Sequence, residues 1–167
     1  MQGTPHILAG AAIGAALGNR RLWLVIPLAF ASHLLLDKVP HLDAHAVFGI
    51  DDMPPTPGEI ITSVIDGIIA IFLIRWLSKH HSASEALWVG GFFAILLDLL
   101  DNIPPWNAWF RGLPIFSSLS HYHQTTQWNV TPHEWILGIS TQAIVIGLSI
   151  FLIFRLNKPP LPAENST

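Results

Sequence analysis

The residues best placed to do chemistry are His33 and Asp37, which lie four positions apart in an otherwise apolar run that Pro40 ends. A spacing of four puts both side chains on one face of a helix, and in this way a single helix can offer two ligands to a metal ion. An uncompensated carboxylate in a membrane helix is costly and usually functional. The pair therefore predicts a divalent-metal site, with His41 free to turn back over the helix end. The alternative is that His33 and Asp37 only bond each other or a neighbouring helix.

Three more carboxylates interrupt apolar segments. They are Asp66 and the pair Asp98 and Asp101, whose spacing of three again places both on one side of a helix. The sequence puts no basic residue beside them in these segments. Carboxylates that lie close together repel one another unless they are protonated or bound to a cation. This pattern favours a metal ion, with protonated acids as the alternative.

A further ligand candidate is His6, which is followed on the same helix face by Gly10, Gly14 and Gly18. Repeated small residues at this spacing let another helix approach closely, so His6 is expected on a packed face rather than towards lipid. The histidines of the segment 121–123 could also bind a metal, but we interpret them as an exposed interfacial pair without a role.

The elements that must position these side chains are five apolar runs, which predict an all-α bundle of five membrane helices in one domain, residues 1–156. The expected helices cover residues 5–18, 22–37, 59–77, 83–100 and 133–154. The first spans only about 20 Å at 1.5 Å per residue, against a hydrocarbon core of about 30 Å. We therefore expect this helix to be tilted, to lie in a locally thinned bilayer, or to be buried among the other helices. The polar, Pro-rich residues 157–167 predict a disordered cytoplasmic tail.

Three of these helices begin at a Thr-Pro pair, with Thr4, Thr56 and Thr131 as the expected N-caps and proline at the first helical position. Glu59 and Glu134 complete the pattern of a capping box at the second and third of these sites. If the helices alternate in direction, the first, third and fifth all start on the same side of the membrane.

Basic residues predict the orientation, because cytoplasmic loops of membrane proteins are enriched in Lys and Arg. Six basic residues fall on one side and only Lys38 and Arg111 on the other, which puts the N-terminus outside and the C-terminus in the cytoplasm. Seven of the nine histidines then lie in the outer half, so the expected site faces outward. The aromatic segment 104–116 is expected to lie in the membrane interface as a lid or a re-entrant segment.

Composition excludes several classes of protein. The 167 residues are 51% hydrophobic and 11% charged, with a mean hydropathy of +0.48, which is atypical of a soluble monomer. A formal charge of −3 and the lack of a basic stripe exclude nucleic acid as the main partner. Since cysteine is absent, any metal must be held by nitrogen and oxygen ligands.

The short Thr4-Pro5-His6 element before a Gly-rich helix, followed by residues 32–41, resembles a bacterial and archaeal family of membrane-bound metal-dependent hydrolases. The His-x-x-x-Asp element is more distantly similar to the zinc-dependent phospholipase C and nuclease superfamily. The resemblance implies a metal-bound water that attacks phosphoesters. It also implies four metal ligands, namely His6, His33, Asp37 and His41.

The sequence thus predicts a metal-dependent hydrolase of a bacterial or archaeal inner membrane, acting on a phosphoester or a lipid headgroup. Imidazole and carboxylate ligands without thiolates favour zinc. Asp66 or Asp98 is expected to add a ligand, and Asp98 or Asp101 to serve as general base. The alternatives are a cation- or proton-coupled transporter that uses the acids within the helices, or a scaffold in which the polar cluster only locks helices together. The oligomeric state stays open.

Overall fold

The structure is a computed structural model that describes residues 1–49 and 55–157, and these residues form helices without a β-strand. The expected all-α class is confirmed. Most of the expected tail lies outside the described residues. The helices are α1 (Gly3–Leu17), η1 (Asn19–Arg21), α2 (Leu22–Leu36), α3 (Ala44–Phe48), α4 (Pro57–Ser78), α5 (Ser84–Asn102), α6 (Trp106–Gly112), α7 (Pro114–Thr126), η2 (Pro132–Glu134) and α8 (Trp135–Leu156).

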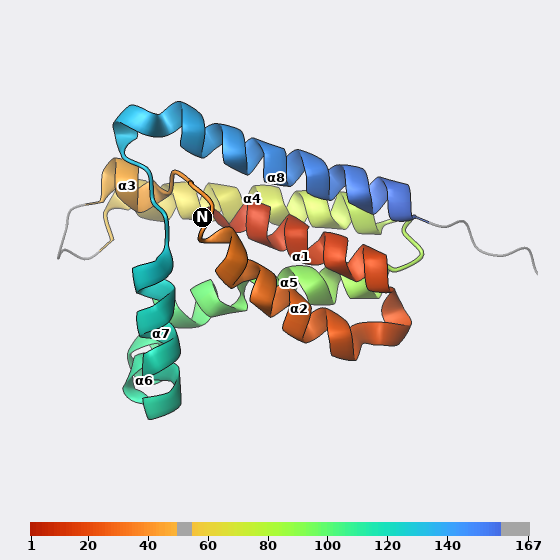
Figure 1. Cartoon of the computed structure of the whole chain (residues 1–167), viewed down its shortest axis with the longest axis horizontal. Helices are drawn as coiled ribbons and strands as arrows, with labels where there is room; N and C mark the ends of the chain where they lie inside the picture. Colours follow the sequence, from red (N-terminus) through yellow and green to blue (C-terminus); the bar gives the residue numbers. More distant parts are fainter. Residues whose placement is uncertain (50–54, 158–167) are drawn as a thin grey trace, which may run out of the picture.

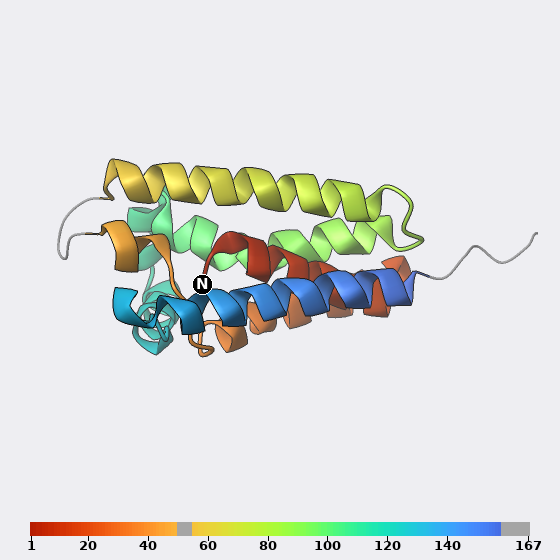
Figure 2. The ribbon, with the colours of Figure 1, turned by 90° about the horizontal axis from the view of Figure 1, so that it is seen from above.

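Five long helices, α1, α2, α4, α5 and α8, lie side by side and alternate in direction (Figures 1 and 2). The starts of α1, α4 and α8 and the ends of α2 and α5 therefore meet at one end of the bundle. The short helices α3, α6 and α7 gather at this same end (Figure 1). We call it the site end.

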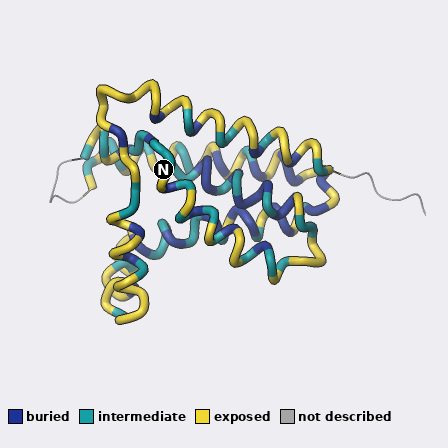
Figure 3. The backbone as a smooth tube through the Cα atoms, in the orientation of Figure 1, coloured by how far each residue is buried: buried dark blue, intermediate teal, exposed yellow. Residues whose placement is uncertain are grey.

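Helix α1 runs through the middle of the bundle, where the buried residues concentrate (Figure 3). Its glycines explain this position. A Cβ atom on Gly10 would collide with the carbonyl oxygen of Gly90, and one on Gly14 would collide with that of Ala86. The expected close approach at the glycine face is confirmed, and α5 is the helix that packs there. Leu8, at 0% exposure, adds to the apolar core around this contact.

Two of the three expected Thr-Pro helix starts are confirmed. Thr56 and Thr131 form capping boxes with Glu59 and Glu134. The prediction for Thr4 is wrong, because α1 begins one residue earlier, at Gly3, with Gln2 at the N-cap position and no side-chain cap.

A carboxylate from another helix takes over the role of the missing cap. The backbone N–H of Thr4 donates to Asp66 Oδ2 at 2.9 Å, and its hydroxyl donates to the carbonyl oxygen of Asp66 at 3.1 Å. An N-cap side chain normally accepts such a bond, so Asp66 on α4 fixes the start of α1 from outside.

Two helices in the described part of the chain are long and apolar enough to cross a membrane, Pro57–Ser78 and Pro132–Leu156. A third span results if α5 and α6, which meet at an angle of 90°, are counted as one. Helices α1 and α2 have 15 residues each, or about 22 Å. By length and composition, the bundle thus contains two or three of the five expected spans.

Candidate metal centre

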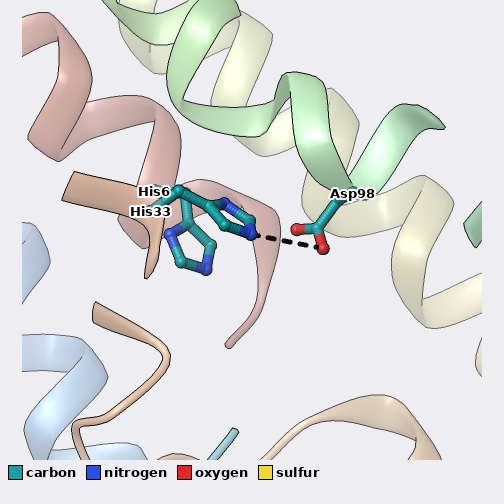
Figure 4. Close-up of side chains that lie close together, drawn as sticks. All are labelled: His6, His33 and Asp98. Atoms are coloured by element: carbon teal, nitrogen blue, oxygen red, sulfur yellow. Dashed lines mark ion pairs between the residues drawn. The ribbon is translucent and has the colours of Figure 1, made fainter. Parts of the chain in front are cut away.

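Five ionisable side chains converge at the site end of the bundle. They come from α1, α2, the residue that caps α2, α5 and α7, and they are His6, His33, Asp37, Asp98 and His123. The three histidines are fully buried and Asp37 is 1% exposed, whereas Asp98 is 23% exposed. Figure 4 shows the stacked rings of His6 and His33 with the Asp98 carboxylate facing them. Asp98 therefore marks the more open side of the cluster.

The imidazoles of His33 and His123 are oriented by hydrogen bonds at their Nδ1 atoms. His33 Nδ1 lies 2.7 Å from the carbonyl oxygen of Ala94, and His123 Nδ1 lies 2.9 Å from Asp101 Oδ2. A carbonyl or carboxylate oxygen accepts, so each Nδ1 carries the hydrogen and donates. In the neutral rings, both Nε2 lone pairs then point into the cluster, where the two Nε2 atoms are 3.2 Å apart.

The distances between the converging atoms match those around a tetrahedral ion. His33 Nε2 and His123 Nε2 lie 3.2 and 3.4 Å from Asp37 Oδ2, and 3.7 and 3.4 Å from Asp98 Oδ1. Ligands at zinc bond lengths of 2.0–2.1 Å in a tetrahedron are separated by about 3.3–3.4 Å. The three ligand atoms of His33, Asp37 and His123 can therefore surround one ion after small adjustments, and Asp98 Oδ1 lies beside the two imidazoles.

Asp37 supplies a second sign of a cation site. Its Oδ2 atom is buried and accepts no well-aligned hydrogen bond from the described residues, although two imidazole nitrogens lie close to it. Its Oδ1 atom lies 3.1 Å from His6 Nε2 and 3.2 Å from the amino group of Met1. A buried carboxylate oxygen without a hydrogen-bond partner is costly, and a metal ion at the centre of the cluster would remove this cost.

Asp101 is the anchor of His123. Besides His123, its carboxylate accepts hydrogen bonds from Ser120 Oγ at 2.6 Å, Arg111 Nε at 2.8 Å and Gln124 Nε2 at 2.9 Å. Arg111 corrects the expectation that the acids have no basic neighbour. It lies on α6, and the 90° bend after α5 brings it back to Asp101.

The electrostatics of His123 follow from its three carboxylate neighbours. Burial of the ring lowers its pKa, but the nearby carboxylates of Asp37, Asp98 and Asp101 outweigh this effect and raise the pKa to about 10. The cluster of acids thus holds a positive charge at the position of His123 Nε2. A bound metal ion would supply that charge in place of the proton.

Two expected ligands lie outside this cluster. Asp66 stabilises the start of α1, as described above. His41 is buried beside the amino group of Met1, and its Nδ1 lies 2.8 Å from the carbonyl oxygen of Val39. Burial and the neighbouring amino group both lower the pKa of His41. Its backbone pairs with Asn129 in an isolated bridge, so it ties the segment after α2 to the segment before α8.

Sequence reasoning missed His123 as a candidate ligand. The prediction of an exposed pair is wrong for this residue, since His123 is fully buried while His121 is exposed. Residues two apart on a helix point in directions about 160° apart, so the two histidines could not share one environment. Gln127, whose Nε2 lies 3.1 Å from His123 Nε2, was also not predicted.

No protein family model, curated protein or solved structure matches this chain. The functional argument therefore rests on the geometry of the cluster.

Proposed function

We propose that the chain is an integral membrane protein with a zinc site formed by His33, Asp37 and His123, and that it hydrolyses phosphoesters. One observation carries the proposal: the Nε2 atoms of two imidazoles and the Asp37 Oδ2 atom, which has no hydrogen-bond partner among the described residues, converge within 3.2–3.4 Å of one another. Two imidazoles and a carboxylate with a fourth, open position are a common ligand set of catalytic zinc.

The remaining side chains have roles that their contacts support. Asp101 holds the His123 ring at Nδ1, and Ala94 holds the His33 ring in the same way. Such bonds fix the orientation of a metal-binding histidine and increase its basicity. His6 contacts the other oxygen of Asp37 and keeps that carboxylate in place.

Asp98 is the residue we assign as general base. It is the most exposed member of the cluster, and its Oδ1 accepts a hydrogen bond from Asn102 Nδ2 at 3.2 Å. Bound zinc supplies a Lewis acid that lowers the pKa of water towards neutrality. Asp98 Oδ1 is positioned to accept the proton of an attacking water. Asp101 does not fit this role, because four donors occupy its oxygens and it is fully buried.

Membrane placement is supported by the outer faces of α4 and α8. Both helices expose a row of large apolar side chains, such as Ile68 at 63% and Phe72 at 67% on α4, and Ile136 at 63% and Phe151 at 61% on α8. Apolar surface of this extent marks contact with lipid or with another protein. We place the bundle in the plasma membrane of a bacterium or archaeon, with five helices, the N-terminus outside and the C-terminus in the cytoplasm.

The substrate class follows from this placement. The site end lies at the level of lipid headgroups on the outer face, so a phospholipid headgroup or another phosphoester at the interface can reach Asp98. The test is a screen of phosphomonoesters, phosphodiesters and phospholipids with zinc-loaded protein in detergent. We expect turnover of at least one class, and the variant Asp98→Asn should keep its zinc but lose most of the rate, about 100-fold or more.

Two results would contradict the proposal. The first is zinc-loaded protein that hydrolyses none of these substrates. The second is an Asp98→Asn variant with unchanged turnover. Metal-independent proton flux in liposomes made with the same preparation would favour the transporter.

A further inference from the structure

The hairpin of α6 and α7 exposes an apolar surface outside the bundle. We call it the hairpin face. It contains large side chains that are between 37% and 82% exposed, namely Trp106, Trp109, Ile115, Phe116 and Tyr122. The hairpin projects to one side of the site end instead of covering it (Figure 1). The bundle contacts this surface at Tyr122, whose ring centroid lies 5.3 Å from Lys38 Nζ, and at Trp106, whose Nε1 donates to the carbonyl oxygen of Leu99. Trp109 and Ile115 are left largely uncovered, at 61% and 82% exposure.

The exposure of the hairpin face does not come from loose attachment. Phe110 is 2% exposed and stacks on Phe116, with ring centroids 5.0 Å apart. Arg111 pairs with the buried Asp101, and Ser120 donates to the same carboxylate. The hairpin is thus fixed to α5 by packed and hydrogen-bonded contacts, and its exposed apolar side chains are held in fixed positions.

The direction of the hairpin matches a membrane surface. The apolar helices α4 and α8 set the axis along which the bundle crosses the bilayer, and α6 leaves α5 at 90°. Figure 1 shows α7 running across the bundle axis at the site end. Both helices of the hairpin then lie in the plane of the membrane at the level of the headgroups.

The composition of the hairpin is that of an interfacial segment. On α7, Ile115 and Tyr122 are seven positions apart and share one face, whereas Ser117 and Gln124 lie on the opposite face. Tryptophan and tyrosine concentrate at membrane interfaces. The segment 102–133 contains Arg111 and histidines but no Asp or Glu, so it meets no repulsion from lipid phosphates.

We propose that the hairpin face binds the headgroup and upper acyl region of the outer leaflet, and that α6 and α7 lie flat in it as an anchor beside the spans. This inference rests on the proposed membrane placement of the bundle, but on neither the zinc ion nor the reaction. Because α7 also carries His123, the anchor fixes the metal centre at the depth where a lipid headgroup lies.

Single-cysteine spin labelling can test the proposal, since the chain has no native cysteine. Nitroxides at Ile115→Cys and Trp109→Cys, in vesicles of phosphatidylcholine and phosphatidylglycerol, should collide more with oxygen than with a water-soluble nickel complex. We expect depths of about 5–10 Å into the boundary between headgroups and acyl chains. Ser117→Cys, on the opposite face of α7, is the matched control and should favour the nickel complex.

Labels at Ile115 and Trp109 that favour the nickel complex as strongly as the label at Ser117 would overturn the proposal. Spin–spin broadening at Ile115 that vanishes on dilution with unlabelled protein would also overturn it, because the partner would then be a second copy. A label at Ile68→Cys on α4 reports the membrane placement separately. If the label at Ile68 also stays in water, the bundle does not span the membrane, and the anchor proposal loses its basis.

Discussion

At the scale of single residues, the centre depends on the bond between His123 and Asp101. The carboxylate fixes the ring through Nδ1, so that Nε2 faces His33 and Asp37. Three other side chains hold the carboxylate itself in place. The position of one proposed zinc ligand therefore depends on residues that would not touch the ion.

The substitution Asp101→Asn should weaken zinc binding by about 10- to 100-fold, the usual cost of losing such a supporting carboxylate. Competition with a chromophoric chelator measures the affinity, and circular dichroism checks that the helix content is unchanged. Glu85→Gln is the matched control, because it makes the same carboxylate-to-amide change at an exposed position at the other end of α5, and it should bind zinc with nearly wild-type affinity. Equal affinities in all three proteins would remove Asp101 from the centre.

Asp66 gives the opposite expectation, because its contacts are with the start of α1. Asp66→Ala should lower the free energy of unfolding by about 0.5–2 kcal/mol, as the loss of a helix cap does, and leave the zinc content unchanged. Thermal unfolding and metal analysis of the same preparation measure both quantities. Loss of zinc without loss of stability would return Asp66 to the ligand set.

The sequence allowed part of this cluster to be predicted. His33 and Asp37 could be paired because their relation is local, four residues along one helix. His123 and Arg111 could not, since their roles arise only when the bend after α5 turns α6 and α7 back towards Asp101. No periodic pattern along the chain encodes a contact of that kind.

At the scale of elements, the packing of α1 against α5 positions the centre, because it brings His6 to the level of Asp98. Gly10 and Gly90 allow the two backbones to touch. The apolar runs were sufficient to predict the long helices to within two residues at each end. They could not predict α6 and α7, because prolines and polar residues interrupt this segment and leave no apolar run of membrane length.

Gly10→Ala should lower the free energy of unfolding by about 1–3 kcal/mol, since the added Cβ meets a backbone carbonyl that cannot rotate away. Gly67→Ala is the matched control. Nothing lies within 4 Å of its Cβ, and alanine is the better helix former by about 1 kcal/mol. Melting in detergent compares the two variants. A Gly10 variant as stable as the Gly67 variant would contradict the close α1–α5 contact.

At the scale of the whole molecule, all the proposed chemistry lies at one end of a bundle whose sides are apolar. Arg20, Arg21, Arg75 and Lys79 lie at or near the turns of the opposite end. This asymmetry favours an outer site end and a cytoplasmic opposite end.

Single cysteines at Ser117 and Ser82 test this orientation, because both residues are exposed and lie at opposite ends. In intact cells, a membrane-impermeant maleimide should label Ser117→Cys, whereas Ser82→Cys should react only after permeabilisation. The reverse pattern would invert the orientation and put the centre on the cytoplasmic side.

The most direct test of the central claim is the zinc content of purified protein after dialysis against a low concentration of chelator. We predict about one zinc ion per chain in the wild type and in His121→Ala, and almost none in His123→Ala and Asp37→Ala. The two histidine variants remove the same group from the same helix, so they differ only in whether the imidazole faces the cluster. Equal zinc content in His121→Ala and His123→Ala, or a wild type without zinc, would contradict the metal centre.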